Sequence, residues 1–403
     1  MKNIAVLFLF LIAFQSFAAA QIPKEGIWKG TIVYSNEEIP FQFEVHYPKD
    51  SESPEFTFIN GEDRATLEAT VRNDSLIIPM FGFDITLKMK QGSDRMEGRL
   101  FKHYRNQSYP FRSEYGLPRY NVKEEKDPIE VGKRWDMTVN KGRSSEYPAV
   151  GLFEQSGNRV TGTIMTEVSD YRFFEGKVEG NSIELSTFDG VHSFLLRGTY
   201  SESDKRWSGE LVLDNGYSRP WIAGRDDSAS LPDPFEMVDL TGKNIKPDLE
   251  SLPVLAHQEI NPDTYEGKVL IVQLMGTWCS NSQDQTRYLT QWVAENPDKN
   301  VEILAVNYEA NYSAAYGLNR IETYKDRLDV PYKMILGGSL SKTKAAEAFS
   351  FMDEIVAFPT LIFIDKKGYA RYVHSYFTGP ATGVYYEDFD QRFNAIVEEL
   401  TRK

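Results

Sequence analysis

The chain of 403 residues contains one cysteine, Cys279, which follows Trp278 at the end of an apolar run. A thiolate at such a position can attack a disulfide and form a mixed disulfide with another molecule. Ser282 stands three residues later, where a second cysteine would release that product. Its hydroxyl can still hydrogen-bond the Cys279 thiolate and favour the charged form. The Cys-x-x-Ser pattern therefore predicts a site that begins thiol–disulfide exchange and needs an external thiol to finish it.

A second motif places Pro359 between Phe358 and Thr360, ahead of another apolar run. Together with the stretch 276–279, this motif resembles the active site of the thioredoxin superfamily, in particular the TlpA or ResA type of envelope thiol–disulfide oxidoreductase. The resemblance covers residues 232–403. It implies a C-terminal α/β domain of thioredoxin-like fold.

The resemblance also implies roles for the motif residues. Cys279, Ser282, Trp278 and Pro359 would form the catalytic group, with Pro359 in the cis form and packed against the cysteine. Phe358 and Thr360 would present backbone groups to an extended substrate peptide, as in strand addition. Because Cys279 precedes a predicted helix, the helix amides should lower the pKa of its thiol. The implied partners are protein thiols or disulfides in the bacterial envelope.

The chain departs from that family at positions that belong together. Family members carry Cys-x-x-Cys followed by a glutamate, and this chain has Ser282 and Gln285 at those two positions. Two functions follow: a monothiol oxidoreductase working through Cys279, or a redox-inactive domain whose groove binds a peptide or partner. A one-cysteine peroxidase is disfavoured, because the upstream proline and threonine of peroxiredoxins are missing. The pKa and accessibility of Cys279 distinguish the first two functions.

Alternating strands and helices are expected from residue 235 onward. Strands are predicted at 268–275, 301–307, 361–365 and 369–374, and helices at 281–294, 321–328, 342–349 and 387–400. Residues 235–244 suit an opening β-hairpin. A polar, proline-bearing linker at 225–234 separates this region from what precedes it.

Residues 26–225 are predicted to be β-rich, with short alternating runs separated by glycine turns. An internal repeat is indicated by an offset of 107 residues between Trp28 and Trp135, and again between Ser75 and Ser182. Phe83-Asp84 and Phe188-Asp189 match at a similar offset. The sequence thus predicts two similar antiparallel modules, each a small barrel or sandwich, at 21–127 and 128–229, before a thioredoxin-like domain at 230–403.

The second predicted module carries a dense cluster of aromatic and charged residues at 170–176 and 188–192. One interpretation is a binding surface. The other is a β-core with turn aspartates, which we favour because aromatic residues at period two usually face a core.

Residues 1–20 have the order of a cleaved signal peptide: Lys2, an apolar run at 4–14, and small residues at 18–20. An interfacial anchor or an uncleaved helix is the alternative interpretation. With no cysteine near this segment, a lipoprotein anchor is excluded, and no later run is long enough to cross a membrane. We therefore expect a periplasmic or secreted protein without an integral membrane anchor.

The net charge of −14 argues against nucleic acid and anionic membrane surfaces as partners. No metal site is expected, because the five histidines show no ligand spacing: His46, His103, His192, His257 and His374. No cofactor is expected either, since no phosphate loop or dinucleotide fingerprint is present.

Overall fold

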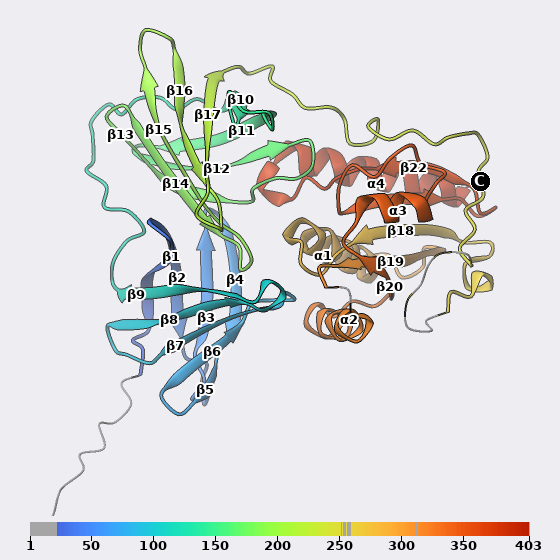
Figure 1. The fold of residues 1–403 in the computed structure, drawn as a ribbon, viewed down its shortest axis with the longest axis horizontal. Coiled ribbons are helices and arrows are strands. Elements are labelled where there is room, and N and C mark those ends of the chain that lie inside the picture. Colours follow the sequence, from blue (N-terminus) through green and yellow to red (C-terminus); the bar gives the residue numbers. More distant parts are fainter. Residues whose placement is uncertain (1–21, 251, 253–254, 256–258, 312, 403) are drawn as a thin grey trace, which may run out of the picture.

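The computed structural model describes residues 22–250, 252, 255, 259–311 and 313–402. The segment expected to be a signal peptide therefore lies outside the described residues, as does His257. Three sheets account for the strands of the described part: a nine-stranded sheet, a closed barrel and a five-stranded sheet. Figure 1 shows the first two at one side of the molecule and the third at the other.

The first sheet is antiparallel and has the strand order β4-β3-β2-β1-β9-β8-β7-β6-β5. Only Ala69 separates the two edge strands along the chain, so the sheet curls until it nearly closes. Aromatic side chains from alternating positions, such as Phe41, Phe43 and Phe58, fill its interior. Its strands are β1 (Gly26–Tyr34), β2 (Glu37–His46), β3 (Glu55–Asn60), β4 (Asp63–Glu68), β5 (Thr70–Arg72), β6 (Ser75–Pro79), β7 (Ile85–Lys90), β8 (Arg95–Lys102) and β9 (Gln107–Tyr115), with a 3-10 turn η1 (His103–Arg105) before β9.

The barrel follows, and each of its strands pairs with the next until the last pairs with the first. Trp135 stacks between Trp207 and Trp221 at its centre, with ring centroids 5.7 Å from each. Its strands are β10 (Arg134–Val139), β11 (Tyr147–Ser156), β12 (Arg159–Thr166), β13 (Phe174–Glu179), β14 (Ser182–Phe188), β15 (Ser193–Ser201), β16 (Arg206–Val212) and β17 (Ser218–Arg225). The predicted β-rich N-terminal region is thus confirmed.

Both tryptophans that mark the predicted repeat lie on the first strand of their sheet. Trp28 Nε1 donates to Lys24 O at 2.9 Å, and Trp135 Nε1 donates to Val131 O at 2.8 Å. Ser75 begins β6 and Ser182 begins β14. The first sheet has one strand more than the barrel.

The C-terminal domain is a five-stranded sheet of order β20-β19-β18-β21-β22, with helices packed on it. Its first three strands are parallel, and β21 and β22 run antiparallel to their neighbours. Every residue of β18 is buried, because both faces of the sheet are covered. The elements are η2 (Pro262–Tyr265), β18 (Val269–Met275), α1 (Ser280–Glu295), β19 (Val301–Glu309), α2 (Ala314–Leu328), β20 (Lys333–Ser339), α3 (Lys342–Ala348), β21 (Thr360–Ile364), β22 (Ala370–His374), η3 (Pro380–Thr382) and α4 (Val384–Arg402).

Two features of this domain differ from the sequence expectation. The hairpin expected at 235–244 is wrong, because the segment pairs with a distant loop: Thr241 N donates to Phe351 O at 2.9 Å, and Leu240 forms a bridge with Met352. Strand β20 was not predicted. In the described part of the chain, no helix combines the length and the apolar character needed to span a membrane.

Candidate active site

Cys279 stands at the junction between β18 and α1, as the residue that caps the helix. Gln283 N donates to Cys279 O at 3.1 Å, which closes the first helical turn behind it. The sulfur lies 3.5 Å from Phe358 O and donates to it. The Phe358–Pro359 peptide bond is cis, as the resemblance implies. The structure thus brings together Cys279 and the proline loop, which are far apart in the chain.

Trp278 and Thr360 contact the segments on either side of this junction. Trp278 Nε1 donates to Tyr308 O at 2.8 Å, and its ring meets Phe358 edge-on with centroids 6.5 Å apart. The Thr360 hydroxyl is buried and donates to Ala357 O and Ser375 O. Thr360 also pairs with Leu274 inside the sheet. Thr360 therefore fixes the proline loop from behind.

The prediction of a lowered pKa for Cys279 is wrong for this arrangement. Burial raises the pKa of the thiol, because only 8% of the residue is exposed and a thiolate there loses its hydration. Ser282 and the amides of the first helical turn lower it, which is the effect predicted from sequence, but they are outweighed. The nearby Asp189 carboxylate adds to the increase.

The positions that depart from the family pattern are also buried. Ser282 is fully buried, and its hydroxyl makes no hydrogen bond of ordinary geometry with the described residues. Gln285 Oε1 accepts from Gln273 Nε2 at 3.1 Å. Two neutral amides therefore pair where a carboxylate would need either a proton or a counter-charge. This pairing explains why a glutamine is tolerated at this buried position of α1.

A buried acid that the sequence analysis missed lies beside the cysteine turn. Glu309, the last residue of β19, accepts from Thr277 N at 3.1 Å and from Thr277 Oγ1 at 2.9 Å. Burial raises the pKa of Glu309. Its signal was an acid two residues beyond position 307, where the buried strand was predicted to end.

Charged residues of the barrel cover the start of α1. Asn281 Nδ2 donates to Asp170 Oδ2 at 2.9 Å, and Arg172 Nη1 lies 2.9 Å from Asp284 Oδ2. Ser280 Oγ lies 3.4 Å from Nδ1 of His192. This helix start directly follows Cys279, which caps α1.

The cluster at 170–176 and 188–192 therefore has two roles. Phe174 and Phe188 are buried in cores, as the favoured interpretation expected. That interpretation is wrong for Asp170, Arg172 and His192, which contact the C-terminal domain. The sequence could not reveal this, because a turn aspartate and an interface aspartate are identical in local pattern.

The loop between β6 and β7 of the first sheet makes a second contact with the C-terminal domain, at α2. Tyr316 Oη donates to Asp84 Oδ2 at 2.8 Å, and Arg327 Nη1 donates to Phe81 O at 2.6 Å. Arg320 donates to Gly82 O. The C-terminal domain is thus held by both β-sheets.

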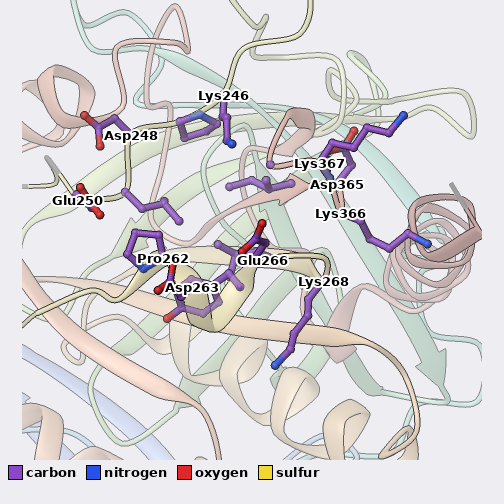
Figure 2. Close-up of a pocket in the computed structure, with 16 residues that line it drawn as sticks. Lys246, Asp248, Glu250, Pro262, Asp263, Glu266, Lys268, Asp365, Lys366 and Lys367 are labelled. Carbon is purple, nitrogen blue, oxygen red and sulfur yellow. Dashed lines mark hydrogen bonds between the residues drawn. The ribbon is translucent and has the colours of Figure 1, made fainter.

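A separate pocket of about 610 Å³ lies at the opposite end of β18 (Figure 2). Both lysines and carboxylates line it, among them Lys246, Lys268 and Asp263. None of its lining residues belongs to the Cys279 site. Within the described ranges, no group of three or more His, Cys, Asp and Glu side chains is placed to hold a metal ion.

Residues 244–373 match the sequence profile of the AhpC/TSA family. The sheet order and this match agree on a thioredoxin-like fold for the C-terminal region, as predicted. A search of curated protein sequences finds no match to the chain.

Solved structures similar to this domain include three described as disulfide enzymes. A thiol:disulfide interchange protein from Chlorobium tepidum is 17% identical, covers 40% of this chain and 98% of its own, and has a TM-score of 0.30. A thiol-disulfide oxidoreductase from Bacteroides fragilis is 15% identical, with 36% and 99% covered and a TM-score of 0.27. A secreted disulfide oxidoreductase from Mycobacterium tuberculosis is 12% identical, with 34% and 90% covered and a TM-score of 0.26.

Proposed function

We propose that the chain is a TlpA-type protein that performs thiol–disulfide exchange through Cys279 alone. The observation that carries the proposal is the contact between the Cys279 sulfur and Phe358 O, 3.5 Å apart, beside the cis Pro359. A sulfur held there at the start of α1 faces the loop along which an extended peptide can add as a strand. Catalytic roles for Cys279, Ser282, Trp278 and Pro359 belong to this proposal, as does peptide binding by Phe358 and Thr360.

The proposed reaction needs no oxidant. The Cys279 thiolate attacks one sulfur of a client disulfide, so that the client S–S bond breaks and a mixed disulfide forms. The other client sulfur leaves as a thiolate. A second client thiol then attacks the mixed disulfide, forms a new client disulfide and returns the Cys279 thiolate. The net result is disulfide isomerisation, which a single cysteine can complete.

We also propose that the chain is exported and acts on protein thiols or disulfides of the envelope. The charge, apolar run and small residues of segment 1–20 support export. We assign modules to 21–127 and 128–229 and the thioredoxin-like domain to 230–403, and we infer that the modules arose by duplication. The matching bonds of Trp28 and Trp135 to the carbonyl four residues earlier support that origin.

The test is reactivation of a scrambled, disulfide-bonded protein by the purified chain, compared with Cys279→Ser. We expect the wild type to speed recovery and the variant to give the uncatalysed rate. A Ser280→Ala variant is the matched control, because it changes a neighbouring hydroxyl and leaves the thiol in place. Equal rates for wild type and Cys279→Ser would refute the reaction and favour the redox-inactive binding domain.

A further inference from the structure

Two loops of the barrel meet the start of α1. The first loop, residues 167–173, connects β12 to β13, and the second, residues 189–192, connects β14 to β15. We call these two loops the roof. Their polar side chains reach residues next to Cys279 on the helix.

Asp170 is the central acceptor of the roof and is 5% exposed. Its Oδ2 accepts from Asn281 Nδ2 and from Gly379 N, both at 2.9 Å. Its Oδ1 accepts from Arg172 N at 2.7 Å, which fixes the loop itself. One carboxylate thus joins the Cys-x-x-Ser turn, the loop after β22 and the barrel.

Arg172 links the barrel to the first sheet and to helix α1 of the C-terminal domain. Its guanidinium lies 2.9 Å from Asp284 on α1 and 4.0 Å from Asp63 on the first sheet. Asp284 and Asp170 both approach Gly379, within 3.3 Å and 3.2 Å of the position that a β-carbon would take there. Arg172 is therefore the nearest cation to the buried Asp284, and its removal leaves that carboxylate only the longer contact of 4.0 Å with Arg287.

We propose that the roof is a size filter, which lets small thiols and disulfides reach Cys279 and excludes protein clients until the Asp170 and Arg172 contacts break. The covered surface is the helix start beside the cysteine, where Asn281 and Asp284 are nine-tenths buried. A protein client that approaches Cys279 across the start of α1 must displace these loops. The inference rests on the proposed function only for the nature of the client.

The test is the labelling rate of Cys279 by N-ethylmaleimide and by a polyethylene-glycol maleimide of protein size. The ratio of the large-reagent rate to the small-reagent rate is compared with that of the denatured chain. We expect a ratio far below the denatured value in the wild type, and an increase of about tenfold or more in Arg172→Gln and in Asp170→Ala. Arg159→Gln is the matched control, because Arg159 pairs with Glu175 within the barrel.

A denatured-like ratio in the wild type would overturn the roof, and so would an unchanged low ratio in both variants. Amide hydrogen exchange of the wild type gives a second readout that needs no variant. The Gly379 amide, bonded to Asp170, should be protected although it precedes η3 and lies outside every strand. Rapid exchange there would also refute the proposal. Neither readout requires thiol–disulfide exchange activity. The roof can therefore be tested even if the proposed function fails.

Discussion

At the scale of single residues, two opposing effects act on the pKa of the Cys279 thiol. The start of α1 favours the Cys279 thiolate, and the low exposure of the sulfur opposes it more strongly. Ser282 keeps a hydroxyl next to the thiol without a second sulfur, and Gln285 is paired with another amide. Under the proposed function, Cys279 is the one nucleophile, and its activation depends on access of solvent to the sulfur.

The first prediction restores the missing sulfur. We expect Ser282→Cys to form a disulfide with Cys279 under mild oxidation, because residues three apart in the first helical turn are the dithiol spacing of thioredoxin-like sites. The variant should lose both free thiols on oxidation and, with glutathione supplied as the reductant, should reduce a dye-linked disulfide with multiple turnovers. Mass spectrometry after alkylation measures the first effect.

Ser280→Cys is the control for that experiment, since its sulfur would follow Cys279 directly and lack the spacing. A Ser282→Cys protein that keeps two free thiols after oxidation would show that the buried turn is too constrained to bring them together. It would also weaken the view that the site descends from a dithiol.

At the scale of elements, packing around β22 and α4 buries a histidine among aromatic side chains. His374 ends β22 and lies against Phe389 of α4, with ring centroids 4.7 Å apart, and against Phe235 at 4.5 Å. Its Nδ1 is buried and makes no hydrogen bond with the described residues. Burial therefore lowers the pKa of His374 to about 3.

The second prediction is a dependence of stability on pH from this packing. The folded pKa of His374 is below its unfolded value, so below about pH 6.5 the unfolded state binds a proton that the folded state does not. From this residue alone, the free energy of unfolding should then fall by about 1.4 kcal/mol for each unit by which the pH is lowered, until the pH reaches the folded pKa of about 3. Asp284, whose pKa burial raises to about 6, contributes with the opposite sign over part of that range.

His374→Phe isolates the histidine contribution, because the aromatic contacts are kept and the titrating group is removed. Urea unfolding at a series of pH values should show a shallower loss of stability in the variant than in the wild type. Identical pH profiles would contradict the assignment of acid sensitivity to this strand and helix.

At the scale of the whole molecule, buried ion pairs hold the three sheets to one another. Lys102 on β8 is fully buried and lies 2.6 Å from Asp214, in the turn between β16 and β17 of the barrel. Tyr34 of the first sheet and Ser193 of the barrel share a hydrogen bond of 2.6 Å. The loops of both sheets also contact the C-terminal domain.

The third prediction tests the junction of the two β-sheets. Lys102→Met leaves Asp214 buried without its partner, and we expect a loss of about 3–5 kcal/mol in the free energy of unfolding. Lys24→Met is the control, because Lys24 and Asp94 form an exposed pair whose loss should change the free energy of unfolding little. Urea unfolding of both variants measures the difference, and equal losses would contradict a structural role for the buried pair.

The local features of this protein can be predicted from its amino-acid sequence. Cys279 and Pro359 mark their own positions because strand ends, helix starts and Phe-Pro-Thr are short-range patterns. Alternating aromatic residues such as Phe41 and Phe43 predict strands for the same reason. These features depend on neighbours in the chain, which a single sequence contains.

Only the tertiary structure decided which distant groups meet at the site. Asp170 and Arg172 look like turn residues in the sequence, and they become site residues because the barrel docks on α1. The pKa of Cys279 is raised rather than lowered as predicted, because the helix amides are local to the cysteine and its burial depends on distant residues. Desolvation depends on everything packed around an atom, and that packing is set by contacts between residues far apart in the chain.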